Sequence, residues 1–328
     1  MPTLTEQKLF GLRADEYEAE GLLARLPPVR GQLTPNASLA EHTWFRVGGP
    51  AEVLFKPADE QDLSYFLAHC PQDVPVTMLG LASNVLIRDG GIPGVVIKLS
   101  PDFAAIKMNG GGLTAGSAAV NLNVARAALA SSLTGLEFLC GIPGTIGGGL
   151  RMNAGAYGRE MKDVVISVRS MDRAGNIHEL RNVDMGFAYR HCRVPDNWIF
   201  LSALLAAEPG YASLIEKKMR EIHQKRATTQ PIREKTCGST FANPENDPLG
   251  RKAWQLIEAA GCRGLKIGQA MVSDKHCNFL INKGRATAAE IESLGEKVRR
   301  RVLAKTGIEL RWEIRRLGVP LPASTQQN

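Results

Sequence analysis

The stretch 137-EFLCGIPGTIGGGLRMNAGAYG-158 is the most informative part of this chain, because seven of its 22 residues are glycine. A flexible linker would be rich in serine and charge, whereas these glycines are interrupted by Ile142, Ile146 and Leu150. Glycine lets backbone N–H groups approach an anion closely and adopts a positive φ without steric cost. The stretch therefore predicts a loop that binds a phosphate-bearing ligand, and a glycine-rich turn beside a buried helix is the alternative.

The spacing of the glycines excludes two familiar phosphate loops. Gly141, Gly144 and Gly147 recur at every third residue. The pattern is neither G-x-G-x-x-G nor a P-loop, which requires Gly-Lys followed by Ser or Thr. A phosphate-bearing cofactor is therefore expected on a scaffold that is neither a Rossmann nor a P-loop fold.

Length and composition indicate a globular protein of two or three domains. The chain has 328 residues, of which 44% are hydrophobic and 22% charged. No apolar run approaches the roughly 18 residues that span a bilayer. The first twenty residues also lack the apolar segment of a secretory signal. We expect a cytoplasmic protein with no membrane partner.

The six cysteines form no C-x-x-C pair and indicate neither a zinc site nor a disulfide framework. His191-Cys192 and His276-Cys277 have no further ligands at a useful spacing, so no metal is expected.

Positive charge is concentrated in the C-terminal third. Residues 211–328 carry a net charge of +10, and residues 1–210 a net charge of −3. This part is expected to meet a polyanion, either a nucleotide diphosphate or a nucleic acid, although a solvated helix surface would look the same. The aromatic residues that a single-strand platform needs are few here, so no nucleic-acid partner is expected.

Hydrophobic periodicity predicts alternating helices and strands. Residues 51–56 and 74–79 are expected to be strands flanking a helix over 59–70, and strands 85–88 and 95–99 to be joined by a tight turn at Asp89-Gly90-Gly91. The other predicted elements are helices over 14–26, 121–132 and 214–227, a hairpin from 164–171 that turns at 172–175, a helix opened by a capping box from Thr287 to Glu290, and a terminal strand over 309–317.

Six motifs occur in the order found in one family. They are Thr43-Trp44-Phe45-Arg46-Val47-Gly48-Gly49-Pro50-Ala51, Ser83-Asn84, the glycine stretch, Tyr189-Arg190, Gly238-Ser239-Thr240-Phe241, and Glu313. Over residues 35–318 the chain resembles the UDP-N-acetylenolpyruvoylglucosamine reductase family. Between Arg190 and Phe241 the only tyrosine is Tyr211, so it resembles the type II branch, which lacks the loop carrying a substrate-closing tyrosine. Ala82 stands where many relatives have glycine.

The resemblance implies an α+β fold, with a two-part FAD-binding module of the vanillyl-alcohol-oxidase (PCMH) type followed by a C-terminal α+β substrate-binding domain. The expected organisation is an N-terminal extension over residues 1–34, FAD-binding subdomains over 35–101 and 102–209, and the substrate-binding domain over 210–328.

The resemblance also implies a reaction. NADPH reduces a non-covalently bound FAD, which reduces the enolpyruvyl group of a UDP-linked amino sugar to UDP-N-acetylmuramate for peptidoglycan. A monomer is expected.

The first rival is an alcohol or sugar oxidase on the same flavin module, in which FAD is often tethered covalently and the motifs around Ser239 and Glu313 would have no role. The second rival is a nucleic-acid-binding protein, suggested by the basic C-terminal third.

Three residues match the catalytic tasks that the resemblance implies. Arg190 offers a planar, permanently charged fork suited to the substrate carboxylate. Ser239 is the expected proton donor, with Lys235 the nearest candidate to support it. Glu313 would repel a developing dianion unless it is protonated or orients another donor, so we expect it to be uncharged or to share a proton.

The resemblance implies further contacts with the two ligands. Residues expected to bind FAD are Arg46, Gly80, Ser83, Asn84, Gly141, Gly144, Thr145, Gly147 and Asn153. Residues expected to bind the nucleotide sugar are Lys235, Arg233 and Asn243.

Overall fold

The computed structural model describes residues 21–322, which form two compact units. Unit 1 comprises the residues up to Ser38, then Pro50–Gly80 and Ile92–Lys218. Unit 2 comprises Leu39–Gly49, Leu81–Gly91 and the residues from Met219 onward. The helix expected over 14–26 lies mostly outside the described residues.

The first sheet of unit 1 has the strand order β1-β2-β5-β3. Its strands are β1 (Gln32–Ser38), β2 (Pro50–Lys56), β5 (Ile92–Ile97) and β3 (Val76–Met78). β1 runs antiparallel to β2, whereas β2 and β3 both run parallel to β5. Strands that pair in parallel need a crossover, and helix α3 (Glu60–His69) lies in the chain between β2 and β3.

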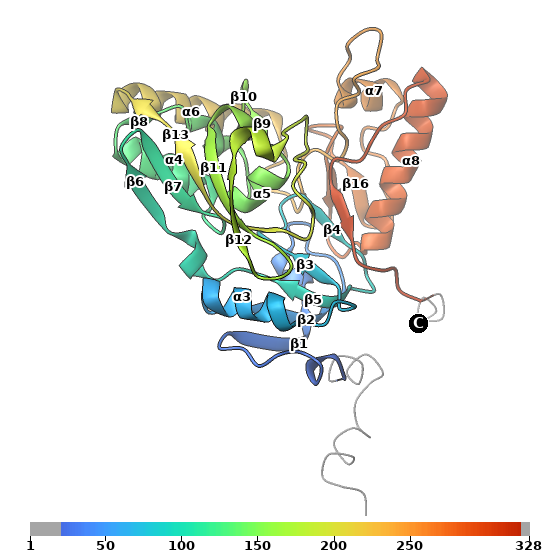
Figure 1. The fold of residues 1–328 in the computed structure, drawn as a ribbon. Coiled ribbons are helices and arrows are strands. Elements are labelled where there is room, and N and C mark those ends of the chain that lie inside the picture. Colours follow the sequence, from blue (N-terminus) through green and yellow to red (C-terminus); the bar gives the residue numbers. More distant parts are fainter. Residues whose placement is uncertain (1–20, 323–328) are drawn as a thin grey trace, which may run out of the picture. The chain divides into compact units, whose positions relative to one another are not determined.

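Helix α3 packs its apolar face against this sheet (Figure 1). Leu63, Phe66 and Leu67 are fully buried, and the ring of Phe66 lies 4.4 Å from that of Phe55 on β2. The helix begins after Asp59, whose side chain accepts a hydrogen bond from Asp62 N at 2.9 Å. The sequence therefore predicted this strand-helix segment correctly to within a few residues.

The second sheet of unit 1 is antiparallel, with the order β12-β11-β13-β7-β6. Its strands are β6 (Ile106–Asn109), β7 (Gly112–Gly116), β11 (Val165–Met171), β12 (Ile177–Arg181) and β13 (Ile199–Ala206). β11 and β12 form the expected hairpin.

The rest of unit 1 consists of short elements. They are α4 (Asn121–Ala130), α5 (Ile146–Arg151), the strand pairs β8 (Leu133–Thr134) with β14 (Glu208–Pro209) and β9 (Gly155–Ala156) with β10 (Arg159–Glu160), and the 3-10 turns η2 (Pro101–Ala104), η3 (Glu137–Gly141), η4 (Met161–Asp163) and η5 (Asn182–Met185). Helix α6 (Ala212–Thr229) begins in unit 1 and ends in unit 2.

Unit 2 contains a three-stranded antiparallel sheet and a parallel strand pair. The sheet is β15 (Lys266–Ile267), β16 (Ala270–Val272) and β17 (Leu280–Asn282); the pair is β4 (Val85–Ile87) with β18 (Arg315–Leu317). The remaining elements are η1 (Ala40–His42), α7 (Ala253–Ala259) and α8 (Ala288–Thr306).

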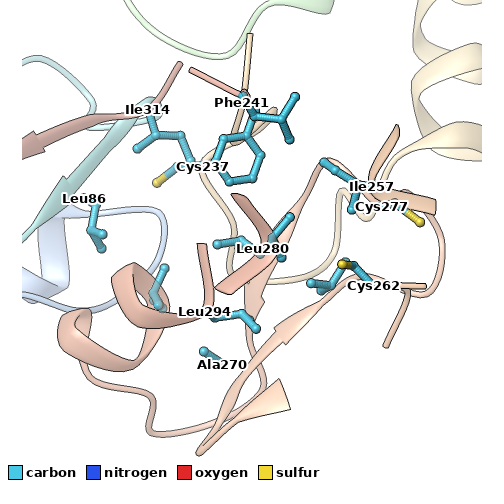
Figure 2. Packing of buried hydrophobic residues seen from close by; sticks show 14 of the residues in the cluster. Leu86, Cys237, Phe241, Ile257, Cys262, Ala270, Cys277, Leu280, Leu294 and Ile314 are labelled. Carbon is cyan, nitrogen blue, oxygen red and sulfur yellow. The ribbon is translucent and has the colours of Figure 1, made fainter. Parts of the chain in front are cut away.

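Helix α8 forms one wall of the core of unit 2. Its capping box is present, with Thr287 Oγ1 accepting from Glu290 N, and Gly307 ends it at φ 72°. The predicted apolar face is buried, including Ile291 and Leu294. Figure 2 shows Leu294 in the same cluster as Leu86, Cys237, Phe241 and Ile314.

The predicted tight turn at 89–91 is confirmed, since Gly91 N donates to Arg88 O at 3.0 Å between β4 and β5, but the two strands belong to different sheets. β4 pairs with β18 in unit 2, whereas β5 pairs with β2 and β3 in unit 1. Within this turn, the side chain of Asp89 accepts hydrogen bonds from Ala288 N and Ala289 N, both at 2.8 Å, and so caps the N-terminus of α8. A Cβ at Gly90 would lie 2.6 Å from Pro320 O, so glycine here allows a close backbone approach.

The terminal strand is shorter than predicted, because only Arg315–Leu317 lies in a ladder. Phe241 and Trp312 form an isolated antiparallel bridge just before it. Within residues 21–322, no helix is both long and apolar enough to cross a membrane.

We expect Gly295→Ala to destabilise the protein. Alanine in a helix interior normally stabilises by about 1 kcal/mol, but this Cβ would lie 2.2 Å from Cη2 of Trp312. The clash should lower the free energy of unfolding by about 1–3 kcal/mol. Urea denaturation followed by tryptophan fluorescence measures it. Gly110→Ala is the control, because nothing lies within 4 Å of its added Cβ. Equal stability of the two variants would contradict the expectation.

Candidate functional site

Two loops that the sequence assigns to the cofactor meet in unit 1. The first loop follows β3 and contains Gly80. The second contains Thr145, the N-cap of α5, whose Oγ1 accepts from Gly148 N at 3.3 Å. A Cβ at Gly80 would lie only 3.1 Å from Thr145 Oγ1. Glycine at position 80 therefore lets the two loops lie side by side without displacing Thr145.

Several backbone N–H groups of these loops are available to a ligand. Within the described residues, no hydrogen bond occupies the N–H groups of Gly80, Gly144 or Thr145. Gly144 has φ 134°, a conformation that residues with a side chain rarely adopt. Amide donors grouped in this way favour an anionic ligand such as a phosphate.

Beside these donors, the chain between β7 and α4 packs closely against α5. Gly147 N donates to Ser117 O at 2.8 Å, and a Cβ at Gly147 would lie 3.1 Å from that of Ser117. Asn121 N donates to Gly144 O at 3.0 Å. Ser117 Oγ and Asn121 Oδ1 are buried and have no hydrogen-bond partner within residues 21–322. Sequence reasoning missed both residues.

These features fit a phosphate-bearing cofactor in unit 1. Amide donors without partners, glycines at points of close approach and buried polar oxygens without partners occur together. A polar atom with no protein partner is expected to meet a ligand or ordered water. Gly141 ends η3 and is buried at the start of the second loop.

Asn153, which the resemblance assigns to FAD, is fully buried. Its Nδ2 donates to Glu160 Oε2 and to Ala188 O, both at 3.0 Å. Its Oδ1 accepts from Lys162 N at 3.0 Å. All the polar atoms of the side chain are thus bonded inside unit 1, and the contact of Asn153 with FAD stays a prediction.

Arg190 lies at the tip of a tight turn in unit 1. Ala188 and His191 close the turn with hydrogen bonds of 3.0 and 3.2 Å. Arg190 has φ 55°, its Nη2 donates to Gly155 O at 3.2 Å, and its guanidinium lies 5.0 Å from the ring centre of Tyr189. The side chain is half-buried.

In unit 2, backbone pairing brings Ser239 and Glu313 close together. Glu313 N donates to Thr240 O and Ala242 N donates to Arg311 O, both at 2.9 Å. Two segments far apart in the sequence therefore run side by side, with the half-buried Ser239 next to the residue that pairs with Glu313.

The loop before β4 joins the same arrangement. Asn84 Nδ2 donates to Glu313 O, and Asn84 O accepts from Arg315 N, both at 3.1 Å. Ala82 has φ 48°, a left-handed conformation that glycine adopts at lower cost than alanine. Ser83 lies between these two residues. Unit 2 thus places the Ser83-Asn84 motif against the Glu313 segment.

Asn278 holds the Ser239 loop from the other side and was not anticipated from the sequence. Its Oδ1 accepts from Phe241 N at 3.0 Å and its Nδ2 donates to Phe241 O at 2.8 Å. Its backbone carbonyl accepts from Thr240 N at 2.7 Å. The side chain is 4% exposed, so these bonds are shielded from water. Asn278 therefore acts as an additional strand partner for residues 240–241.

Two titratable groups near the loop are held neutral. Burial raises the pKa of the Cys237 thiol to about 12, and its Sγ lies 3.3 Å from Val85 O. Cys237 is thus a neutral thiol and not a nucleophile. Burial also lowers the pKa of His276, whose Nδ1 accepts from Asn278 N at 3.2 Å.

The predicted substrate contacts lie at the surface of unit 2. Lys235, Arg233 and Asn243 are all exposed. Lys235 forms an isolated bridge with Asn282, and Asn243 Oδ1 accepts from Ala253 N at the start of α7.

Arg46, predicted to bind FAD, is also exposed and lies in unit 2. It has φ 58°, and its guanidinium donates to Glu41 O.

Comparison with known proteins identifies the family. Residues 230–317 match the C-terminal domain of UDP-N-acetylenolpyruvoylglucosamine reductase, and residues 51–181 match an FAD binding domain. The reductase of Azorhizobium caulinodans is 56% identical over 299 residues, which cover 91% of this chain and 96% of that protein. The reductase of Rhodospirillum rubrum is 55% identical over 301 residues, 92% of this chain and 94% of that protein.

The chain belongs to the UDP-N-acetylenolpyruvoylglucosamine reductase family. The crystal structure of the Thermus caldophilus reductase superposes with a TM-score of 0.76 at 30% identity and covers 89% of this chain and 100% of that one. The predicted fold class is therefore confirmed: an α+β protein with an FAD-binding module of the vanillyl-alcohol-oxidase type and a C-terminal substrate-binding domain.

Membership also confirms the prediction of an FAD-dependent oxidoreductase of peptidoglycan precursor synthesis, with a UDP-sugar substrate and a nicotinamide cofactor. The assignment of individual site residues in this reductase stays a prediction.

We expect Asn278→Leu to damage both the stability and the activity of this reductase. The substitution leaves the N–H and C=O of Phe241 buried without partners, which should cost about 1–3 kcal/mol of unfolding free energy. The turnover number should fall as well, because the Ser239 loop loses its clamp. Urea denaturation and steady-state kinetics measure the two effects. Asn246→Leu, on an exposed residue, is the control. Wild-type stability and turnover in Asn278→Leu would show that the clamp is dispensable.

Proposed function

We propose that this chain reduces the enolpyruvyl group of UDP-N-acetyl-3-O-(1-carboxyvinyl)-glucosamine to UDP-N-acetylmuramate at the expense of NADPH, with Ser239, Arg190 and Glu313 as its catalytic residues. One observation supports the residue assignment above others. Glu313, the proposed acid, pairs through its backbone with Thr240, the residue that follows the proposed proton donor Ser239, and this supports a shared role for the two. The relatives' names support the reaction.

The cofactor-binding role falls to the two loops of unit 1 described above. Gly80, Gly144 and Thr145 would donate backbone N–H groups to the FAD diphosphate, with Gly141 and Gly147 allowing close approach. Ser83, Asn84 and Arg46 are further proposed FAD contacts. We propose that FAD is held without a covalent tether. Bound FAD would supply the hydride, which it accepts from NADPH.

Arg190 would bind the substrate carboxylate. Hydride addition to the terminal carbon of the enolpyruvyl group places negative charge on the neighbouring carbon and on the carboxylate. A guanidinium stays charged in any environment and matches two carboxylate oxygens with two N–H groups. Arg190 therefore stabilises charge that grows during the reaction, which is the interaction that lowers a barrier.

Ser239 would deliver the proton. Its Oγ–H bond breaks as a C–H bond forms at the carbanionic carbon, and the serine oxygen then recovers a proton from water. Serine is a weak acid, but the acceptor is a strong base, so transfer is favourable once geometry is fixed. Lys235, four residues earlier, is the proposed cation that supports the transient alkoxide.

Glu313 would act in its protonated form. An ionised carboxylate beside the growing dianion would raise the barrier, whereas a neutral carboxylic acid donates a hydrogen bond to it. We therefore expect an infrared difference spectrum of the substrate complex to show a protonated carboxyl band that disappears in Glu313→Gln. Ionised Glu313 in that complex would contradict this role.

The nucleotide part of the substrate is assigned to the basic surface of unit 2. Lys235 and Arg233 would meet the diphosphate, and Asn243 would contact the nucleotide sugar. All three are exposed. We further propose that the enzyme acts as a monomer in the cytoplasm, without nucleic-acid or membrane partners.

The test is an anaerobic stopped-flow experiment on wild type and Ser239→Ala. NADPH should bleach the flavin of both proteins at the same rate, because that half-reaction needs no proton from Ser239. Return of the flavin colour on adding the enolpyruvyl nucleotide sugar should be at least about a hundredfold slower in the variant. Ser213→Ala, on an exposed residue of α6, is the control. Normal recovery in Ser239→Ala would assign the proton to another group, and absence of flavin from wild type would overturn the function itself.

A further inference from the structure

Arg190 has a backbone conformation that the rest of unit 1 must maintain. It is one of seven described non-glycine residues with positive φ, at φ 55°. Such a conformation in a residue with a long side chain costs of the order of 1 kcal/mol and persists only when its surroundings impose it. The two hydrogen bonds between Ala188 and His191 close the turn but do not attach it to the rest of the unit.

Asn153 provides an attachment. Its Nδ2 donates to Ala188 O, the first residue of the turn, at 3.0 Å. The same nitrogen donates to Glu160 Oε2, and Oδ1 accepts from Lys162 N, both at 3.0 Å. One buried amide thus joins the turn to the far arm of the hairpin formed by β9 and β10. Figure 1 labels both strands.

The near arm of that hairpin holds the guanidinium. Gly155 O accepts from Arg190 Nη2 at 3.2 Å, and Gly155 lies two residues after Asn153. The hairpin is closed by pairing of Gly155 with Glu160 and by a hydrogen bond of 3.0 Å from Met161 N to Ala154 O. A single short segment therefore fixes both the backbone and the head group of Arg190.

The backbone at Asn153 explains why asparagine suits this position. Asn153 has φ 39°, and asparagine tolerates left-handed conformations better than most residues. Its amide also supplies two donors and an acceptor, and all three are used. No other residue type meets both requirements.

We propose that Asn153 is a positioning residue for Arg190: it anchors the turn of residues 188–191 so that the guanidinium is presented to the substrate carboxylate. The proposal rests on the assignment of Arg190 in the proposed function. In this role Asn153 acts through Arg190 and needs no contact with substrate or cofactor, which agrees with its complete burial.

The test compares two ligands that differ by the carboxylate. Calorimetry measures the dissociation constants of the oxidised holoenzyme for the enolpyruvyl nucleotide sugar and for UDP-N-acetylglucosamine, which lacks that group. Asn153→Gly removes the side chain without straining the left-handed backbone. It should weaken binding of the enolpyruvyl ligand about tenfold or more. Binding of UDP-N-acetylglucosamine and the flavin content should be unchanged.

The control is Asn36→Gly, the same change at another left-handed asparagine of unit 1, on β1, with φ 46°. It should leave both dissociation constants unchanged. In an Arg190→Ala background, Asn153→Gly should have no further effect on the enolpyruvyl ligand, since its action passes through Arg190.

The outcomes that contradict the proposal are distinct. Equal weakening of both ligands would make Asn153 a general structural residue, and loss of flavin would assign it to the cofactor. Unchanged binding would show that the turn needs no anchor. Arg190→Ala should itself weaken binding of the enolpyruvyl ligand and leave binding of UDP-N-acetylglucosamine unchanged. If it does not, the role proposed for Arg190 fails, and the proposal for Asn153 fails with it. The single variant Arg190→Ala therefore separates this failure from a failure of the Asn153 proposal alone.

Discussion

One antiparallel backbone pairing, between residues 240–242 and 311–313, sets the geometry of unit 2. It places Trp312 against Phe241, with ring centres 5.1 Å apart. Trp312 also packs over Gly295 of α8 and donates from Nε1 to Glu296 at 2.8 Å. The loop before β4 is tied to the same place through Asn84. Main-chain atoms make the central bonds of this pairing, and the side chain of Asn278 adds two more to Phe241.

The sequence predicted local elements well where the cause of the structure is local. The α8 capping box, the β11–β12 hairpin and helix α3 depend on residues within a few positions of one another. The turn at 89–91 was predicted as well, but the contact that Asp89 makes was not. The role of Asp89 is set by Ala288, 199 residues away, and no short-range pattern contains that information. The last strand was overestimated because residues before Arg315 form single bridges in place of a ladder.

The same division applies to the site. Motifs pointed to Ser239, Arg190, Glu313 and the glycine loops, and family membership supports the flavin chemistry expected of them. The hydrogen bonds that tie these segments to the rest of the protein were not predicted. Asn278 and Asn153 look like ordinary polar residues in the sequence, and only the fold shows that every polar atom of their side chains is bonded to a distant backbone or side-chain group. Sequence motifs identify the reactive residues more readily than they identify the residues that bond to them in the folded protein.

The interleaving of the two units has a consequence for how the chain is made. Phe45, Val47 and Leu86 belong to the hydrophobic core of unit 2, whose other members begin at Cys237. A ribosome adds about 5–20 residues per second, so these three apolar side chains emerge of the order of ten seconds before the residues that bury them. During that interval the nascent chain exposes a surface that belongs to a core not yet synthesised. Ribosome-associated chaperones act on exposed apolar surface of this kind, and completion of unit 2 must wait for the last third of the chain.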